Sequence, residues 1–116
     1  MSEYLPKFPQ GQAMTFAVKS AVEGGQLVEI VEANAVGPAG ADSAKVVGVA
    51  GFDAGVGQMV TVYAGGVQRV KAAGAVTAGA KVYAAAEGQV QASGTNALGL
   101  ALNAAAKTGE IVEVLI

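Results

Sequence analysis

Apolar residues come in short runs that alternate with polar ones, and glycine-rich turns separate these runs about every ten positions. Runs of this length, enriched in Val with Thr, Ile and Tyr, are typical of the strands of a small β-barrel or sandwich. The expected strands are 14–18, 26–31, 45–51, 58–63, 67–72, 81–84, 89–92, 98–102 and 110–116. The expected turns are 23–25, 37–40, 64–66, 87–88 and 93–94. The pattern predicts an all-β fold with a single β domain over residues 13–116.

Only residues 97–107 have the composition of a helix, because they are rich in alanine and leucine. Gly99 lies inside this segment and Gly109 follows it, and glycine interrupts or ends helices. We therefore expect a strand followed by an alanine-rich turn.

Two stretches of the chain repeat one another in the same order. The matching segments are 20–28 with 74–82, 46–50 with 97–101, and 57–62 with 109–114. Val36 and Val90 extend the first match at the same offset. Similar segments that recur in the same order indicate a duplicated structural unit. The sequence thus predicts two pseudo-repeated halves, 14–63 and 68–116.

Alternation within two of the expected strands predicts which side chains face the core. The residues expected in the core are Val60, Val62, Val112 and Val114. The residues that point the other way, at equivalent places in the two halves, are Met59, Tyr63, Ile111 and Leu115. Because this second face is also apolar, either a second sheet covers it or it forms a subunit interface. Both explanations remain open at this stage.

The first twelve residues differ from the rest, since they hold two of the three prolines and two of the six aromatic residues. Proline fixes its own φ and favours extended backbone in the residue before it, so residues 1–12 are expected to form an extended arm. A frayed terminus is the ordinary alternative, but such a tail has little use for large apolar side chains. The residues expected to dock on a partner are Tyr4, Leu5, Pro6, Phe8 and Pro9.

Composition points to association with other chains. Hydrophobic residues make up 53% of the sequence, yet the mass is only 11.3 kDa because many of them are alanine, so the expected single core is thin. Charged residues are only 14% of the chain, which suggests that part of the apolar surface is covered by protein. The apolar runs are far shorter than the roughly 20 residues of a membrane span. We expect synthesis in the cytoplasm and no membrane partner.

The inventory of reactive side chains is short. With no His and no Cys, systems that pair a nucleophile with histidine and thiolate metal sites are excluded, and we expect no enzyme activity, cofactor or metal. The closely spaced or loop carboxylates are Glu29, Glu32, Glu110, Glu113, Asp42 and Asp53. Carboxylates on exposed strands usually face solvent or protect an edge. The net charge of −2 gives no basic stripe for nucleic acid. Arg69 and Lys71 share one strand, where a surface ion pair is the default and a partner contact the alternative.

Three segments carry a resemblance to a known family. They are Tyr4 to Phe8, the run from Gly37 to Ala50, and the phrase Val-Thr-Val-Tyr-Ala-Gly-Gly-Val-Gln-Arg at 60–69. These segments resemble the capsid cement, or head decoration, proteins of tailed phages that infect actinobacteria, and the likeness runs over nearly the whole chain.

The resemblance implies a structural virion protein on the outer capsid surface. Proteins of this kind often bind as homotrimers at three-fold and quasi-three-fold positions and hold neighbouring major capsid subunits together. The main rival is a cell-surface or carbohydrate-binding β module. Such modules stack aromatic rings on sugars, and this chain has few aromatic residues outside its arm. A tail or baseplate component of the same virion is a further alternative.

Overall fold

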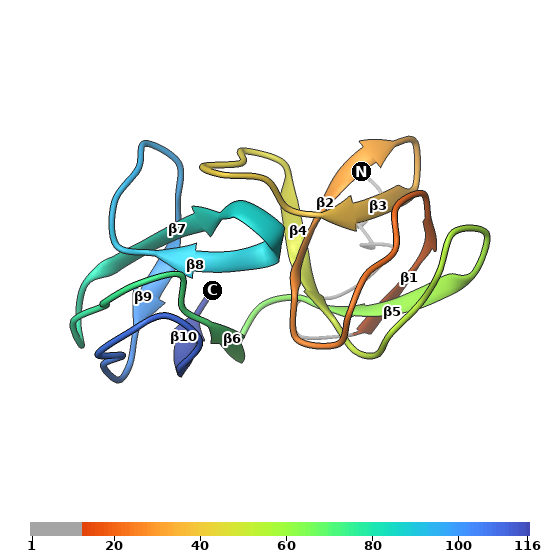
Figure 1. Cartoon of the computed structure of the whole chain (residues 1–116). Coiled ribbons are helices and arrows are strands. Elements are labelled where there is room, and N and C mark those ends of the chain that lie inside the picture. The colour runs from red at the N-terminus through yellow and green to blue at the C-terminus, as the bar shows by residue number, and fades with distance from the viewer. Residues whose placement is uncertain (1–12) are drawn as a thin grey trace, which may run out of the picture.

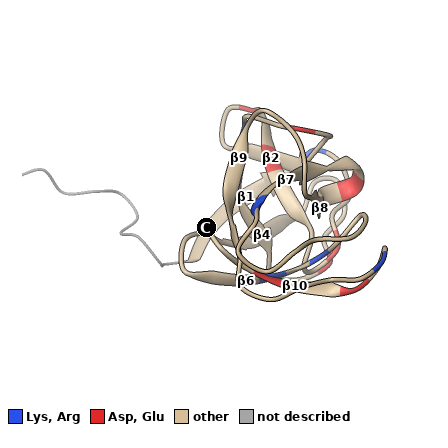
Figure 2. Cartoon of the chain, turned by 90° about the vertical axis from the view of Figure 1, so that its left-hand side faces the viewer, with Lys and Arg blue, Asp and Glu red and all other residues tan. Residues whose placement is uncertain are grey.

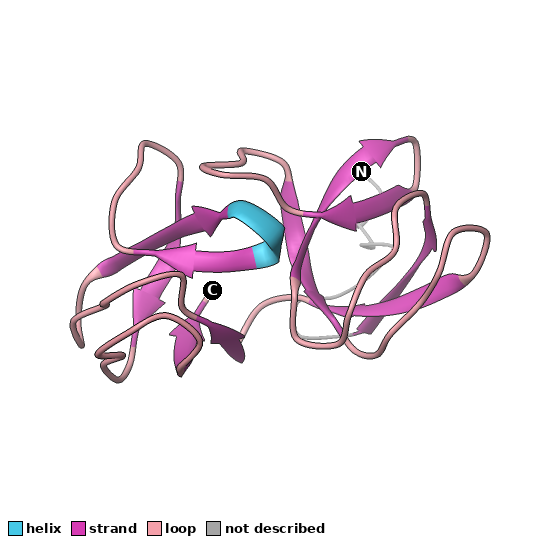
Figure 3. Cartoon of the chain, viewed as in Figure 1, coloured by secondary structure: helices cyan, strands magenta, loops and turns pink. Residues whose placement is uncertain are grey.

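The computed structural model describes residues 13–116, and within this range the regular secondary structure is almost entirely β-strand, joined by loops (Figure 3). The strands are β1 (Ala13–Val18), β2 (Leu27–Glu32), β3 (Ala35–Pro38), β4 (Val46–Ala50), β5 (Met59–Tyr63), β6 (Val67–Lys71), β7 (Lys81–Ala85), β8 (Gln89–Gln91), β9 (Ala97–Ala101) and β10 (Ile111–Leu115). A single 3-10 turn, η1 (Ala86–Gly88), joins β7 to β8. The predicted all-β class is confirmed. The predicted docking arm, residues 1–12, lies outside the described residues.

The first five strands form a closed barrel in the order β1-β3-β2-β4-β5 (Figure 1). Each pairing is antiparallel except that of β1 with β3, where the two strands run parallel and Ala17 and Val18 lie opposite Ala35 and Val36. The parallel pairing of β1 with β3 completes the ring, so the barrel has no free strand edge.

The second five strands form a sheet in the order β6-β10-β9-β7-β8. With β6 taken as the counterpart of β1, each pair of neighbouring strands in the second half corresponds to a pair in the barrel. The counterpart of the β1–β3 pairing, β6 with β8, is reduced to a single bridge between Ala72 and Val90. Even an irregularity is shared: the register of β2 on β4 shifts after Val28, which lies opposite Gly48, and the register of β7 on β9 shifts after Val82, which lies opposite Gly99.

The turns of the two halves are also bonded alike. Val22 and Ala54 exchange backbone hydrogen bonds of 2.9 and 3.0 Å, and Val76 and Ala105 exchange two of 2.9 Å. A duplication explains both the sequence echo and this agreement. The division at 14–63 and 68–116 stays a prediction.

Buried side chains fall into two clusters, so the expectation of one core is wrong. The first cluster contains Val18, Val22, Val28, Val36, Ala50, Ala54, Val60 and Val62. The second contains Leu27, Ala39, Val49, Val70, Ala72, Val76, Val82, Ala84, Val90, Ala101, Ala105, Val112 and Val114. Because valine and alanine fill only a narrow interior, each half curls around its own small core.

The outer side of the barrel packs against the second half. Leu27 on β2 and Val49 on β4 lie opposite each other and point away from the barrel interior, yet both are buried in the second cluster. Ala39, just beyond β3, joins them there. The barrel wall thus serves as one side of the second core, which joins the two halves through apolar contact.

A polar contact made by Asp42 also joins the halves. Its carboxylate accepts hydrogen bonds from the backbone N–H groups of Thr95, at 3.0 Å, and Asn96, at 2.9 Å. Its own N–H donates to the carbonyl oxygen of Ala84 at 2.7 Å. Asp42 adopts a φ of 54°, in the left-handed region that Asp tolerates better than most residues.

Substitution of Asp42 by alanine is expected to lower the free energy of unfolding by about 1–3 kcal/mol, because Thr95 and Asn96 lose a charged acceptor. Asp42→Asn keeps one acceptor oxygen and the tolerance for positive φ, so it should cost less than half as much. Thermal unfolding followed by circular dichroism measures both variants. Equal stability of Asp42→Ala and the parent protein would contradict this role.

Strand β3 is the main departure from the expected strands. The sequence predicts a turn over 37–40, whereas Gly37 and Pro38 belong to β3. Proline is tolerated there because it is the last residue of the strand, paired with Val28. The expectation for 97–107 is confirmed, since β9 ends at Ala101 and no helix follows.

Candidate functional site

Large apolar side chains are exposed mainly on four strands of the described chain. The ten are Val31, Phe52, Val56, Met59, Tyr63, Val67, Leu100, Leu102, Ile111 and Leu115. Six of these lie on β5, β6, β9 or β10. The four predicted interface residues are among them, each with about half of its surface exposed, so no second sheet covers this face within residues 13–116. The structure does not gather them at one place: Met59 and Tyr63 lie at the two ends of β5 in the barrel, and Ile111 and Leu115 lie at the two ends of β10 in the second sheet.

One apolar row crosses the outer face of the second half. Val67 on β6 lies opposite Leu115 on β10, which lies opposite Leu100 on β9, and this row ends at Lys81 on β7. The alternation of single strands identifies Leu115, but Val67 and Leu100 were not predicted. Cross-strand register is what adds them, and register is not readable from one strand.

The corresponding row in the first half is mostly buried. Tyr63 on β5, Val49 on β4 and Leu27 on β2 form that row. Val49 and Leu27 are buried beneath the second half, whereas Leu100, the counterpart of Val49, is 38% exposed. The outer face of the barrel is therefore covered by the second half, whereas the equivalent face of the second half is exposed. This exposed face is a candidate surface for binding another protein.

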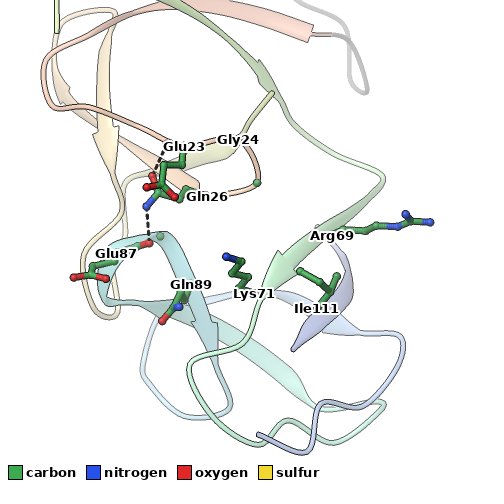
Figure 4. Close-up of a pocket in the computed structure, with 10 residues that line it drawn as sticks. Glu23, Gly24, Gln26, Arg69, Lys71, Glu87, Gln89 and Ile111 are labelled. Atoms are coloured by element: carbon green, nitrogen blue, oxygen red, sulfur yellow. Dashed lines mark hydrogen bonds between the residues drawn. The ribbon is translucent and has the colours of Figure 1, made fainter. Parts of the chain in front are cut away.

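A hollow of about 260 Å³ lies between the two halves, next to β6 (Figure 4). Its lining comes from the turn 23–26, from Arg69, Lys71 and Ile111, and from residues 87–89. Figure 4 shows Lys71 directed toward the turn and Arg69 directed away from it. The side chain of Gln26 spans one end of the hollow, donating a hydrogen bond of 3.1 Å to the carbonyl oxygen of Glu87.

Arg69 forms the surface ion pair expected of it, and its Nε lies 3.5 Å from Oε2 of Glu113. The Arg69 side chain is largely exposed and that of Glu113 is partly exposed, so the pair adds little stability. Lys71 lies opposite Ile111 at the edge of the hollow. These two cations are available to a partner without the loss of a buried contact.

The candidate carboxylates accept hydrogen bonds from loop backbone or form surface ion pairs, and they do not gather at one site. The side chain of Asp53 accepts from Gly24 N–H at 2.9 Å, and that of Glu110 accepts from Ala106 N–H. Glu32 pairs with Lys19 at 3.2 Å. Within residues 13–116 no group of three or more His, Cys, Asp or Glu residues could hold a metal ion, and no helix is long and apolar enough to cross a membrane. Charged residues are spread over loops and over β6 and β10 (Figure 2).

Glu29 gives the fold a small dependence on pH. The backbone N–H of Gly40 donates to its Oε1 at 2.9 Å and holds the pKa of Glu29 below its usual value of 4.5, against a partial desolvation that raises it. A lowered pKa stabilises the fold above pH 4.5 and loses this effect as the pH falls through the folded-state value. Glu29→Gln should therefore lower stability at pH 7 by about 1 kcal/mol or less and leave stability at pH 3 nearly unchanged. Urea unfolding at the two pH values tests this, and an equal loss at both would contradict it.

Comparison with known proteins identifies a family and a similar solved structure. The family model described as phage cement protein matches residues 8–116. Among solved structures, the head fiber gp8.5 N base of bacteriophage phi29 is similar, with a TM-score of 0.74 and 19% sequence identity. The superposition covers 90% of this chain and 92% of that one. At this identity the second match shows a shared fold. No curated protein sequence matches the chain.

The family match extends from the described β strands back into the predicted arm, since it begins at Phe8. It spans both halves, so neither half alone accounts for it. The resemblance to capsid cement proteins seen in the sequence is confirmed. The chain belongs to the phage cement protein family, and it is a structural protein associated with a phage capsid.

Proposed function

We propose that this protein binds the outer surface of the phage capsid and stabilises it by clamping neighbouring major capsid subunits. The observation that carries the proposal is the exposed apolar face of β6, β9 and β10, formed by Val67, Leu100 and Leu115. The corresponding face of the first half is largely buried against the second half of the same chain. An exposed row of large apolar side chains is typical of a surface that binds another protein.

Stabilisation follows from linkage. A protein that binds the junction between assembled capsid subunits, and not the separate subunits, shifts the equilibrium toward the assembled shell. Nothing in this mechanism requires an active site or a cofactor. The surface needs only to fit a junction that exists in the mature lattice.

We further propose a homotrimer at three-fold and quasi-three-fold positions, formed in solution or on the capsid, with Met59, Tyr63, Ile111 and Leu115 at or near its interface. Three copies that bind together raise the effective concentration of each remaining contact once the first is made. Modest contacts can then hold a shell durably. The arm residues Tyr4, Leu5, Pro6, Phe8 and Pro9, together with Arg69 and Lys71, are the proposed additional contacts to the capsid or to a neighbouring copy.

The interface is tested by Ile111→Lys combined with Leu115→Lys. Both side chains are exposed, so the melting temperature should change little, whereas two ammonium groups in a buried contact should weaken decoration of empty shells at least tenfold. Val56→Lys, in an exposed turn of the first half, is the matched control. Light scattering gives the oligomeric state in solution, and cryo-electron microscopy of decorated shells gives it on the capsid. Monomers in solution whose capsid-bound copies do not touch would contradict the trimer.

A further inference from the structure

The second half closes less completely than the first. In the barrel, Ala17 N–H donates to the carbonyl oxygen of Asn34 at 3.2 Å, and Lys19 N–H donates to that of Val36 at 2.9 Å. The second half keeps the counterpart of the latter bond, from Ala73 to Val90 at 2.7 Å. The counterpart of the former would join Lys71 to Gly88, and it is not made in the described chain.

Gly88 bonds to the first half of the chain and not to β6. Its N–H donates to the carbonyl oxygen of Ala39, in the first half, at 3.0 Å. A Cβ at this position would lie 2.6 Å from the carbonyl oxygen of Leu27, so η1 packs directly on β2. Gly88 is thus packed and bonded against the first half, and the hollow lies between it and Lys71 where the counterpart bond is missing.

The open seam leaves one edge of β6 unpaired. Ala72 N–H bonds toward β10, through Glu110, and Ala73 N–H bonds toward β8. Alternation along an extended strand then directs the N–H groups of Val67, Arg69 and Lys71 toward the seam. Within residues 13–116 no hydrogen bond joins these three groups to another residue. Such a row of free backbone groups is a template for an added strand.

We propose that the N-terminal arm of a second copy adds to the free edge of β6 as a strand, with its Glu3–Lys7 segment beside the hollow. The inference rests on the proposed function, because it names the partner of the arm within the decoration assembly.

The arm has the backbone that a one-sided strand needs. Leu5 and Lys7 carry N–H groups on one edge of an extended segment, while Pro6 lacks an N–H on the opposite edge, where none is needed. Pro9 falls on the pairing edge without an N–H and so ends the ladder. The arm can thus pair with one strand and cannot recruit another.

The charges of the hollow match those of the arm. Arg69 and Lys71 lie on β6, and the acidic side chains Glu23 and Glu87 lie on the other walls. Alternate residues of a strand share one face, so the arm presents one carboxylate and one ammonium, of Glu3 and Lys7, on the same side. The hollow thus offers a cation, Lys71, for the carboxylate and two carboxylates, Glu23 and Glu87, for the ammonium group.

The stiffness of the arm favours a second copy over the same chain. Ala13, where the described chain begins, is paired with Tyr63 at the end of β5. The chain then turns into β6 through Gly65 and Gly66, both with positive φ (Figure 1). Pro6 and Pro9 fix their own backbone dihedrals and stiffen the arm against folding back onto its own chain.

Disulfide trapping tests the proposal, and the absence of native cysteine makes it clean. Leu5→Cys is combined in turn with Val67→Cys, Arg69→Cys and Lys71→Cys, since neighbouring strands bring Cα atoms within the range of a disulfide. At least one pair should give covalent dimers and trimers under mild oxidation on decorated shells, at ten times or more the yield of Leu5→Cys with Leu102→Cys. A disulfide within one chain would overturn the second-copy assignment, and the absence of any disulfide above control would overturn strand addition.

Proline scanning of the arm gives an independent readout. Leu5→Pro removes an N–H from the pairing edge and should abolish the trapped species, whereas Tyr4→Pro removes one from the free edge and should keep at least half of it. Equal effects would overturn the strand geometry. Decoration of shells by the parent protein is measured alongside. Normal decoration without trapping refutes the inference alone, whereas no decoration at all refutes the proposed function.

Discussion

Substitution of Gly48 or Gly99 by alanine is expected to lower the free energy of unfolding by about 3 kcal/mol or more, which corresponds to a fall of roughly 10 °C in melting temperature. A Cβ on Gly48 would collide with the carbonyl oxygen of Tyr63, and one on Gly99 with the carbonyl oxygen of Leu115. These obstacles are backbone atoms of the neighbouring strand, so no side chain can rotate to relieve them. The strands must separate, and the ladder hydrogen bonds that hold β4 to β5 and β9 to β10 lengthen with them.

Gly74→Ala is the matched control, because a Cβ there meets nothing within 4 Å and its φ is not positive. It should be neutral or raise stability by about 0.4–1 kcal/mol through a stiffer unfolded chain. Thermal and urea unfolding of the three variants make the comparison. If Gly48→Ala and Gly99→Ala matched Gly74→Ala, the close approach of strands would not limit these positions, and the structural equivalence of the two glycines would lose its main physical support.

Local pattern was enough to place most strands. The valine and threonine runs of β5 and β10 alternate cleanly, and the fully buried Val60, Val62, Val112 and Val114 lie on the face that alternation assigns to the core. The shared Gly48 and Gly99 positions also follow from the sequence echo. These features depend on period and on neighbours close along the chain, which a sequence displays directly.

Features set by tertiary contact could not be predicted in this way. Strand β3 is only four residues long and contains Gly37 and Pro38, so local preference indicates a turn, and only its pairing with β1 and β2 makes it a strand. The open seam is harder still, because it depends on Gly88 bonding to Ala39 across the two halves. Leu27 and Val49 look like ordinary strand residues, yet they face outward and form part of the second core.

Deletion of residues 2–9 is expected to weaken capsid binding by an order of magnitude or more while leaving the melting temperature nearly unchanged. The small effect on stability is expected because residues 1–12 are predicted to form an extended arm that docks on a partner. The segment carries Tyr4, Leu5 and Phe8, and each can contribute roughly 1.5–3 kcal/mol when its apolar surface is fully covered on docking. Its prolines also reduce the conformational entropy lost on binding, because part of the chain is already extended.

Binding of labelled protein to undecorated shells, with and without the deletion, measures the effect. Tyr4→Ser combined with Phe8→Ser keeps the arm length and should account for most of the loss, whereas Gln10→Ser combined with Gln12→Ser should bind as the parent does. A backbone-only contact would instead survive the loss of both aromatic rings and fail on deletion, which would assign the affinity to strand addition on β6. Full binding by the shortened protein would leave the arm without a role in the clamp, and the contact would then have to come wholly from the exposed face of β6, β9 and β10.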